Sequence, residues 1–419
     1  MKIKSIRAYE VLASGGYPSI EAEVTLENGI TGVASVPYGA SAGSHEATVL
    51  EDKDPARYDG HGMLKAASNV NTEISQAIVG MEVEDQLSID KKMIELDGTP
   101  NKARLGGNAI LAASVAAARA AANLKSVPLY RHIIDTFNTG VDLNHLPNPM
   151  VVVIEGGKHA DNSTDLQEFC MSGVGEISVT ENIRKVIESY HKLKPILSGH
   201  NLSTNVGNEG AFAPSGIETN ESPFLYILEA ISHAGYTPGK DIKISVDSAS
   251  SEFYENGKYN LKLENRSLTA DELSSYFQSW FQKYPFVTFE DPFAEDDWEN
   301  WVKFLPIAKQ MGVEIVGDDL TVTNIERLQK AIDLKAISSI LIKLNQIGSL
   351  SETVACCMLA KQNGLMTVTS HRGGGETNDA AMVDLAVAVG SKFVKVGPTR
   401  GERVAKYNRL MQIESELRG

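Results

Sequence analysis

Six short apolar segments in the second half of the chain each end at a charged residue or at a residue that can bind a metal. The segments are IKISVD, FVTFED, VEIVGDD, SSILIKLN, LMTVTSHR and KFVKVG, and their polar ends lie roughly 24 to 43 residues apart. One buried strand and one helix fill such an interval, and this pair is the repeating unit of a parallel α/β barrel. Because the strands of such a barrel end at one rim, we expect the terminal side chains to meet at one mouth. They are Asp247, Glu290, Asp318, Lys343, His371, Arg372 and Lys395.

The chain is long enough for two domains. Its 419 residues exceed the size at which one hydrophobic core keeps growing, and 42% of them are apolar, as in an ordinary globular protein. Polar and apolar residues alternate between Ile3 and Val36 around the turn Asn28-Gly29, which predicts three antiparallel strands. A helical pattern follows over 64–124. Strands followed by helices indicate an α+β domain.

The domain boundary is expected in a stretch rich in Asn, Pro and Thr over residues 135–149. We therefore predict an α+β domain over 1–136 and an α/β barrel domain with the catalytic residues over 142–419. Within the first domain, the segment SVPYGASAGSHEA is rich in small residues and too long for a tight hairpin. Residues 36–47 are expected to form a mobile lid, with a disordered surface loop as the alternative.

Charge and composition exclude several classes of partner. The net charge is −15 and no cluster of Lys and Arg occurs, which argues against nucleic-acid binding; a small anionic substrate would need local positive charge or a metal. No uncharged run of about 18 apolar residues predicts a membrane span, and the N-terminus does not resemble a signal peptide. The three cysteines fit neither a zinc site nor a disulfide framework. We expect a cytoplasmic protein.

Asp247, Glu290 and Asp318 end three different strands of the expected barrel. Oxygen ligands from separate strand ends suit Mg²⁺, which takes few carboxylates and keeps several waters. Each carboxylate alone could instead cap a following helix or turn. Three of them at one rim favour a metal site.

Two lysines lie inside apolar runs, Lys343 in ILIKLNQIG and Lys395 in FVKVG. A buried ammonium group is costly unless it is paired or deprotonated. Burial and nearby cations lower the pKa of a lysine, so Lys343 could act as a base. The alternative is a structural ion pair with an acid at a neighbouring strand end.

Three further groups of residues are candidates for binding an anion or for proton transfer. His371 and Arg372 precede three glycines, an arrangement that favours an anion site over a flexible turn. The segment EGGKHADNSTDLQEF carries His159, Gln167 and Glu168, and NVGNEGAFAP carries Glu209. Alone, each of these two segments also fits a loop, and His159 fits a structural histidine.

Together these segments resemble the enolase family over essentially the whole chain. The motifs are EDPFAEDDW at 290–298, DDLTVTN at 318–324, KLNQIGS from Lys343, GKHADN with LQEF, and GERVAKYNRL near the C-terminus, in the enolase order. The resemblance implies an enolase-type (β/α)8 TIM-like barrel preceded by an α+β capping domain. It also implies the glycolytic dehydration of 2-phosphoglycerate to phosphoenolpyruvate, two Mg²⁺ ions per active site, and a homodimer or higher homo-oligomer.

The resemblance also implies roles for individual residues. Lys343 would remove the proton from C2 and Glu209 would help the C3 hydroxyl leave, with Glu168 and His371 assisting. The ligands of the tighter Mg²⁺ would be Asp247, Glu290 and Asp318, and Ser41 in the lid would bind the second ion. Substrate would contact His159, Gln167, Ser41, Arg372, Gly373, Lys395, Glu290 and Asp318. Arg372 would bind phosphate, and Lys395 would lie near the carboxylate.

Several positions depart from the family pattern. The usual Ser-His-Arg-Ser-Gly-Glu-Thr has three glycines after Arg372 here, so a phosphate-binding hydroxyl is missing and the loop is one residue longer. Tyr38 and Ala42 replace Ser and Thr in the lid, and the usual Asp-Ser-Arg-Gly-Asn-Pro reads ASGGYP over 13–18. Asn208 replaces an Asp before the acid.

These departures leave the expected metal ligands and the base unchanged. One alternative is therefore a substrate-shifted paralogue that acts on a related phospho- or phosphono-carboxylate, as carboxyphosphonoenolpyruvate synthase does. The other alternative is a non-catalytic protein with a binding role or a role at a surface.

Overall fold

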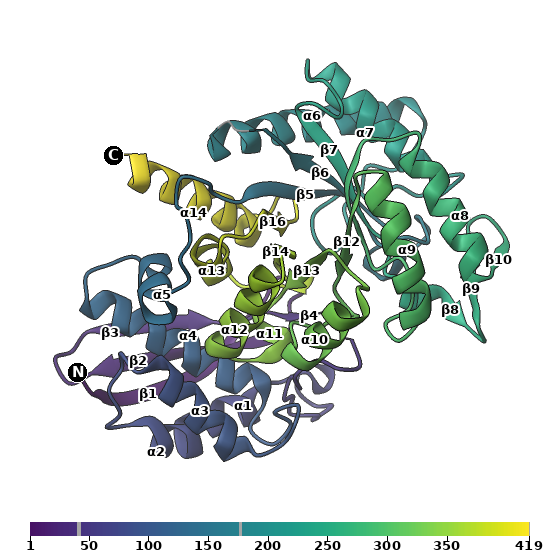
Figure 1. Ribbon diagram of the computed structural model, residues 1–419. Coiled ribbons are helices and arrows are strands. Elements are labelled where there is room, and N and C mark those ends of the chain that lie inside the picture. The colour runs from purple at the N-terminus through teal and green to yellow at the C-terminus, as the bar shows by residue number, and fades with distance from the viewer. Residues whose placement is uncertain (40–42, 176–177, 419) are drawn as a thin grey trace.

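The computed structural model describes residues 1–39, 43–175 and 178–418, and it contains two domains (Figure 1). The expected three-stranded antiparallel sheet is confirmed, with the order β1-β2-β3. Its strands are β1 (Ile3–Leu12), β2 (Pro18–Leu26) and β3 (Thr31–Ser35). Helices α1 (Leu64–Asn69), α2 (Ser75–Ile78), α3 (Gln86–Asp97), α4 (Gly107–Leu124) and α5 (Leu129–Phe137) follow.

Small residues allow α4 to lie directly on the sheet. The helix is rich in alanine because a larger side chain would hold the two layers apart. At Gly32 of β3, an added Cβ would lie only 2.1 Å from the backbone nitrogen of Ala120 and 2.4 Å from the carbonyl oxygen of Ala116. The apolar face of β2 closes the other side of this core, where Ile20 and Val24 are fully buried.

The second domain is a closed eight-stranded barrel, as expected. Going around the barrel, the strand order is β5, β6, β7, β11, β12, β13, β14 and β16. The strand bounds are Asn148–Glu155, Glu168–Gly173, Ile242–Asp247, Phe286–Glu290, Glu314–Gly317, Ser339–Ile342, Met366–Ser370 and Phe393–Val396. Each of the six apolar runs that predicted the barrel forms one strand, from β7 to β16.

Helices cover the outside of the barrel (Figure 1). They are α6 (Val179–Gly199), α7 (Ser222–His233), α8 (Ala270–Phe281), α9 (Trp298–Gln310), α10 (Ile325–Leu334), α12 (Leu350–Gln362), α13 (Ala381–Val389) and α14 (Gly401–Arg418). A short helix, α11 (Leu344–Ile347), directly follows the strand that carries Lys343. Small side chains and aliphatic side chains such as Val152, Leu341 and Val368 fill the inside of the barrel below the mouth.

The prediction that every strand of the barrel runs parallel and is followed by a helix is wrong at one place. Strand β6 runs antiparallel to both of its neighbours, β5 and β7. Only a short turn, Gly157–His159, and a loop join β5 to β6, and a connection without a long helix returns the chain antiparallel. Two helices, α6 and α7, then precede β7. The first residue of β6, Glu168, therefore lies at the rim where the other strands end.

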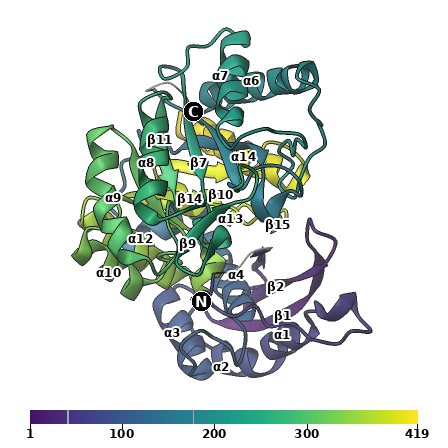
Figure 2. The same ribbon diagram turned by 90° about the vertical axis from the view of Figure 1, so that its right-hand side faces the viewer.

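Two small sheets flank the rim. Strands β8 (Tyr254–Glu255), β9 (Lys258–Leu261) and β10 (Arg266–Leu268) form one. Strand β4 (Tyr38–Gly39) pairs with β15 (Gly374–Gly375) to form the other, and Figure 2 shows β15 on the side of the barrel that faces the N-terminal domain. Among the described residues, no helix has the length and apolar character that a membrane crossing requires.

Candidate active site

Four acidic residues form a continuous row at the rim of the barrel. Strand pairing places Glu155 opposite Glu168, Glu168 opposite Asp247, and Asp247 opposite Glu290. All four residues are buried. Because like charges in a buried row repel each other, this part of the mouth needs protons or cations to be stable.

Lys395 at the end of β16 supplies one of these cations. Its Nζ atom lies 2.7 Å from Glu168 Oε2, 2.7 Å from Glu290 Oε2 and 3.6 Å from Asp247 Oδ2. Burial disfavours the ammonium group, but the surrounding carboxylates outweigh it and raise the pKa of Lys395. Burial, together with the negative charge of Glu209, raises the pKa of Glu168 to about 8. One ammonium group thus faces three carboxyl groups, of which Glu168 keeps its proton near neutral pH.

Lys343 forms the structural ion pair that the sequence left open as an alternative. Its Nζ atom lies 2.5 Å from Asp318 Oδ2, and the side chain of Gln346 donates to Asp318 Oδ1 at 2.8 Å. Burial is the largest single effect and lowers the pKa of Lys343, but the nearby carboxylates, Asp318 first among them and then Glu290, together outweigh it, so the pKa is raised. The lowered pKa that was expected for this lysine is therefore not found while Asp318 is its partner.

The expected metal ligands fit Mg²⁺ by their chemistry. Asp247, Glu290 and Asp318 all come from adjacent strand ends and offer only oxygen atoms. Glu290 Oε1 is buried, and no group in the described residues 1–39, 43–175 and 178–418 donates a hydrogen bond to it. Burial, with the charges of Asp247 and Asp318, raises the pKa of Glu290 well above its usual value. A buried carboxyl oxygen among other carboxyl groups is a suitable ligand for a divalent cation, which would replace the proton that the raised pKa implies.

Other groups of potential ligand atoms at this rim are closer together. Donor atoms within 4.8 Å of one another occur in Asp291, Asp318 and Asp319, and in His159, Glu168 and Glu209. Asp291 has a structural role, because its two oxygens accept the backbone N–H groups of Asp318 and Asp319, both at 2.9 Å. Ser41, the expected ligand of a second ion, lies outside the described residues.

Glu209 is held on the wall of the mouth where β6 begins. Its Oε2 lies 3.1 Å from His371 Nε2, and its Oε1 lies 3.5 Å from His159 Nδ1. Although burial opposes ionisation, the charges of His371 and His159 hold the pKa of Glu209 well below its usual value. His371 in turn has a raised pKa, because Glu209 and Glu376 outweigh its burial. The Glu209–His371 pair therefore carries a proton.

The remaining residues expected around the substrate line the same mouth. His159 Nδ1 lies 3.4 Å from Glu168 Oε1, and the side chain of Gln167 donates to Asp247 Oδ2 at 3.5 Å. Arg372 donates from Nη1 to Glu46 Oε1 at 2.9 Å. Among the described residues, the structure thus collects every predicted site residue around the barrel mouth; most line it directly, and Glu290 joins it through Lys395.

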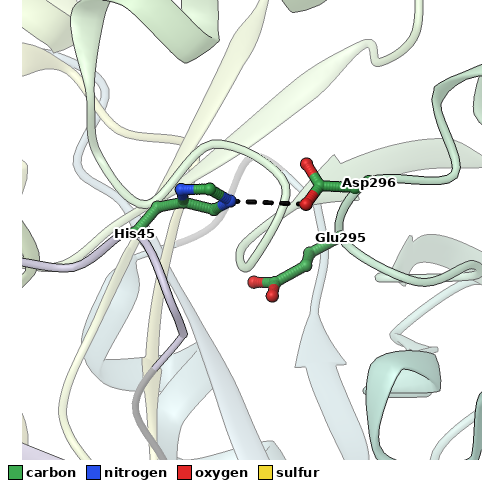
Figure 3. Close-up of side chains that lie close together, drawn as sticks. All are labelled: His45, Glu295 and Asp296. Atoms are coloured by element: carbon green, nitrogen blue, oxygen red, sulfur yellow. Dashed lines mark hydrogen bonds and ion pairs between the residues drawn. The ribbon is translucent and has the colours of Figure 1, made fainter.

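The described part of the predicted lid contacts the barrel next to this mouth. Ser44 Oγ donates to Glu295 Oε1 at 2.7 Å. Figure 3 shows the ring of His45 pointing at Asp296, with Glu295 beside them, and the Nε2 to Oδ2 distance is 3.4 Å. These contacts hold Ser44 and His45 against the loop after β11, whereas the predicted mobility of the lid stays a prediction.

The glycines after Arg372 serve close packing. An added Cβ at Gly373 would lie 2.1 Å from Glu209 Oε1, and one at Gly375 would lie 2.6 Å from the ring of Tyr38. At Gly39 of the lid, it would lie 1.8 Å from the guanidinium group of Arg372. Since Gly374 and Gly375 pair with the lid strand, the structure explains these glycines by packing rather than by binding of an anion.

Three segments that carry departures from the family pattern contact one another. An added Cβ at Gly15 would lie 2.5 Å from the carbonyl oxygen of Gly374, and β15 pairs with β4, which contains Tyr38. The backbone nitrogen of Ser14 also donates to the carbonyl oxygen of Glu376 at 2.8 Å. We call residues 13–17, 38–39 and 373–376 the lid interface. Asp247, Glu290, Asp318, Lys343 and Lys395 form the strand-end cluster, which contains no departure.

Four residues that hold the predicted site residues in place were not predicted from the sequence. Glu155 accepts the backbone N–H of Glu209 at 3.0 Å and of Ala211 at 2.8 Å, so it holds the loop that carries the expected acid. Burial and Glu209 raise the pKa of Glu155 to about 8. Glu155 ends the apolar run VVVIE, so a search for apolar segments that end at a charged residue could have found it. The other three are Glu46, Gln346 and Glu376; the quoted motifs contain Gln346 and Glu376 but do not indicate a role for them.

Comparison with family models decides the relationship. The model described as "Enolase, N-terminal domain" matches residues 3–133, and the one described as "Enolase, C-terminal TIM barrel domain" matches residues 143–419. The chain belongs to the enolase family. Membership agrees with the barrel, the N-terminal domain and the acidic mouth, and it makes the protein a Mg²⁺-dependent lyase of the enolase type, whose family binds small phospho-carboxylates.

Proposed function

We propose that this enolase-family protein dehydrates 2-phosphoglycerate to phosphoenolpyruvate. The observation that carries the proposal is the placement of its two expected proton-transfer groups on opposite walls of one mouth. Lys343 follows β13, and β13 lies four strands from β6 in either direction around the eight-stranded barrel. Glu209 lies beside Glu168 at the start of β6, through their shared neighbour His159. A substrate between these walls can lose a proton to one side and a hydroxyl group to the other.

Lys343 is the proposed base at C2. As an amine it accepts the proton, and Lys395, which stays positively charged on β16, stabilises the negative charge that develops on the substrate carboxylate. Mg²⁺ held by Asp247, Glu290 and Asp318 would neutralise the same charge and compete with Lys343 for Asp318. Without its carboxylate partner, the buried Lys343 would have the lowered pKa that a base requires.

Glu209 with His371 is the proposed acid at C3. The proton carried by this pair is delivered to the leaving hydroxyl group, which departs as water. Glu168, with its pKa raised to about 8, holds a second proton near the same place. Arg372 is the proposed ligand of the phosphate group, and the planar fork of its guanidinium group suits such an anion.

A second candidate, dehydration or related chemistry on a phosphono-carboxylate, is favoured by one observation. Glu209 Oε1 occupies the space that a side chain at position 373 would need. The phosphate end of the site therefore differs in shape from the family pattern, whereas the strand-end cluster does not. A non-catalytic role is less well supported, because a buried row of acids with two paired lysines is costly to maintain for binding alone.

The test is direct. Purified protein with Mg²⁺ and 2-phosphoglycerate should form the ultraviolet-absorbing enol phosphate, and Lys343→Ala should not. If the wild type produces no absorbance at millimolar substrate but turns over a phosphono analogue, the second candidate replaces the first. If neither compound reacts, the catalytic proposal is wrong. The expected cytoplasmic location and homo-oligomeric state remain predictions.

A further inference from the structure

A second pocket lies between the two domains, on the far side of the loop that carries His371 and Arg372. Its walls come from α4 of the N-terminal domain and from α11 and α13 of the barrel, which lie near one another in Figure 1. Leu111, Leu344 and Met382 make these walls mostly apolar. The charged mouth of the barrel has the opposite character, so this interdomain pocket is suited to a different kind of molecule.

Asn345 of α11 is the unusual residue in the interdomain pocket. Only 6% of its surface is exposed, and neither its side-chain nitrogen nor its side-chain oxygen has a hydrogen-bond partner within the described part of the chain. The adjacent Gln346 differs, because its amide donates to Asp318 at 2.8 Å and accepts from Thr323 at 2.8 Å. A buried amide without partners is destabilising, so it indicates that a polar group from outside the chain completes this site.

The charged groups that border the interdomain pocket already have partners of opposite charge. Lys406 pairs with Glu376, and His371 pairs with Glu376 and Glu209. Asp379 accepts from both terminal nitrogens of Arg119, at 2.5 and 2.6 Å. Arg372 pairs with Glu46. Since no net charge is left for a ligand to neutralise, the pocket favours an uncharged molecule.

The chemistry of Asn345 defines the polar part of that molecule. A side-chain amide presents an N–H donor beside a C=O acceptor, and its best complement is a group with an acceptor beside a donor, such as a carboxamide or a lactam. The apolar walls from both domains would contact a small hydrocarbon body. We propose that the interdomain pocket is a second ligand site, for a small neutral molecule that presents a carboxamide or lactam edge to Asn345.

The proposal can be tested with 2-pyrrolidinone as the probe. It is titrated into the full-length protein and followed by saturation-transfer NMR, and crystals soaked in the probe locate it. We expect saturable binding at about millimolar concentration for so small a ligand, with density beside Asn345. No saturable binding below about 100 mM, or density elsewhere with water alone in the pocket, would overturn the proposal.

Two matched controls separate the pocket from general effects. Asn345→Leu should weaken binding by at least about tenfold, whereas Asn363→Leu, at the exposed end of α12, should leave it unchanged. N-methyl-2-pyrrolidinone, which lacks the N–H donor, should bind the wild type more weakly by about the same factor. Equal binding of 2-pyrrolidinone to Asn345→Leu and the wild type would refute the role of the amide.

Thermal unfolding gives a readout that needs no ligand. Asn345→Leu replaces an unpartnered amide by an apolar group of similar size, so the melting temperature should stay equal or rise. A fall of more than about 2 °C would show that the amide already has a partner in the folded protein, and this result would also count against the proposal.

Discussion

The mouth of the barrel combines two regions that are built in different ways. In the strand-end cluster, charged side chains project from buried strands and are held by ion pairs, such as that between Lys395 and Glu290 at 2.7 Å. In the lid interface, backbone segments lie in direct contact because Gly39, Gly373 and Gly375 have no side chains. The first region depends on charge and the second on shape. Charge sets the chemistry of a site, whereas shape selects the molecule that enters it.

The largest effect is expected in the strand-end cluster. Lys343→Ala removes the proposed base and leaves Asp318 without its ammonium partner. Turnover should fall by about 10³-fold or more, and exchange of the substrate C2 proton with deuterated water should be lost as well. Steady-state kinetics and NMR of the substrate measure the two effects. Exchange that persists at the wild-type rate would remove Lys343 from the role of base.

In the lid interface, the largest expected effect is a loss of folding stability when Glu376 is protonated at acid pH. Glu376 accepts the backbone N–H of Arg372 at 2.7 Å and pairs with Lys406, and its pKa is lowered to about 2 from an ordinary value of 4.5, because Lys406 and His371 outweigh burial. As pH falls below about 4.5, the unfolded chain takes up this proton before the folded one does. Stability that is present above pH 4.5 is therefore lost towards pH 2, by roughly 3 kcal/mol.

Glu376→Gln should remove this dependence. The variant should be less stable at pH 7 by about 3 kcal/mol, since one partner of a buried pair is lost, and its stability should fall less between pH 4.5 and 2. Denaturant unfolding at several pH values measures both effects. An unchanged acid dependence would mean that Glu376 is not ionised in the folded protein.

Gly373→Ala should separate the two regions. The new Cβ would displace Glu209, which is held by His371, so elimination should slow by about 10²-fold. The strand-end cluster is not touched, and C2 proton exchange should stay near the wild-type rate. Gly373→Ser should behave in the same way, because the Cβ itself makes the contact. Loss of exchange in step with turnover would contradict the division into two regions.

The smallest effect is expected at the lid contact of Arg372. Glu46→Gln removes the charge that pairs with the guanidinium group at 2.9 Å, so Arg372 becomes more available to an anionic substrate. We expect KM to change by no more than about tenfold, with a nearly constant kcat. A large loss of kcat would show that Glu46 takes part in the chemistry.

Side-chain chemistry made much of the barrel predictable. Buried parallel strands are apolar along their length, and their polar ends identify the rim, which is why Asp247, Glu290 and Asp318 could be placed together. The direction of β6 could not be predicted, because it depends on the short connection after β5, which has the composition of an ordinary polar loop. The importance of Glu168 at the start of β6 therefore followed from the resemblance and not from its position in a strand.

Packing was harder to predict than charge. The sequence favours an anion site for the glycines after Arg372, because a glycine in a sequence does not show which atoms approach it. In the structure, the backbone of the loop meets Tyr38 and Glu209, and these contacts join segments more than 300 and 150 residues apart in the chain. The ion pair of Lys343 was foreseen as an alternative, but its partner depends on the order of the strands.

The most direct test of the proposed proton-abstraction site is exchange at C2 in the wild-type protein. The protein is incubated with Mg²⁺ in deuterated water, with 2-phosphoglycerate or with a phosphono analogue, and the C2 proton signal is followed by NMR. Loss of that signal from at least one of the two compounds before or during product formation is the predicted result. A C2 signal that is unchanged in both compounds would contradict the account.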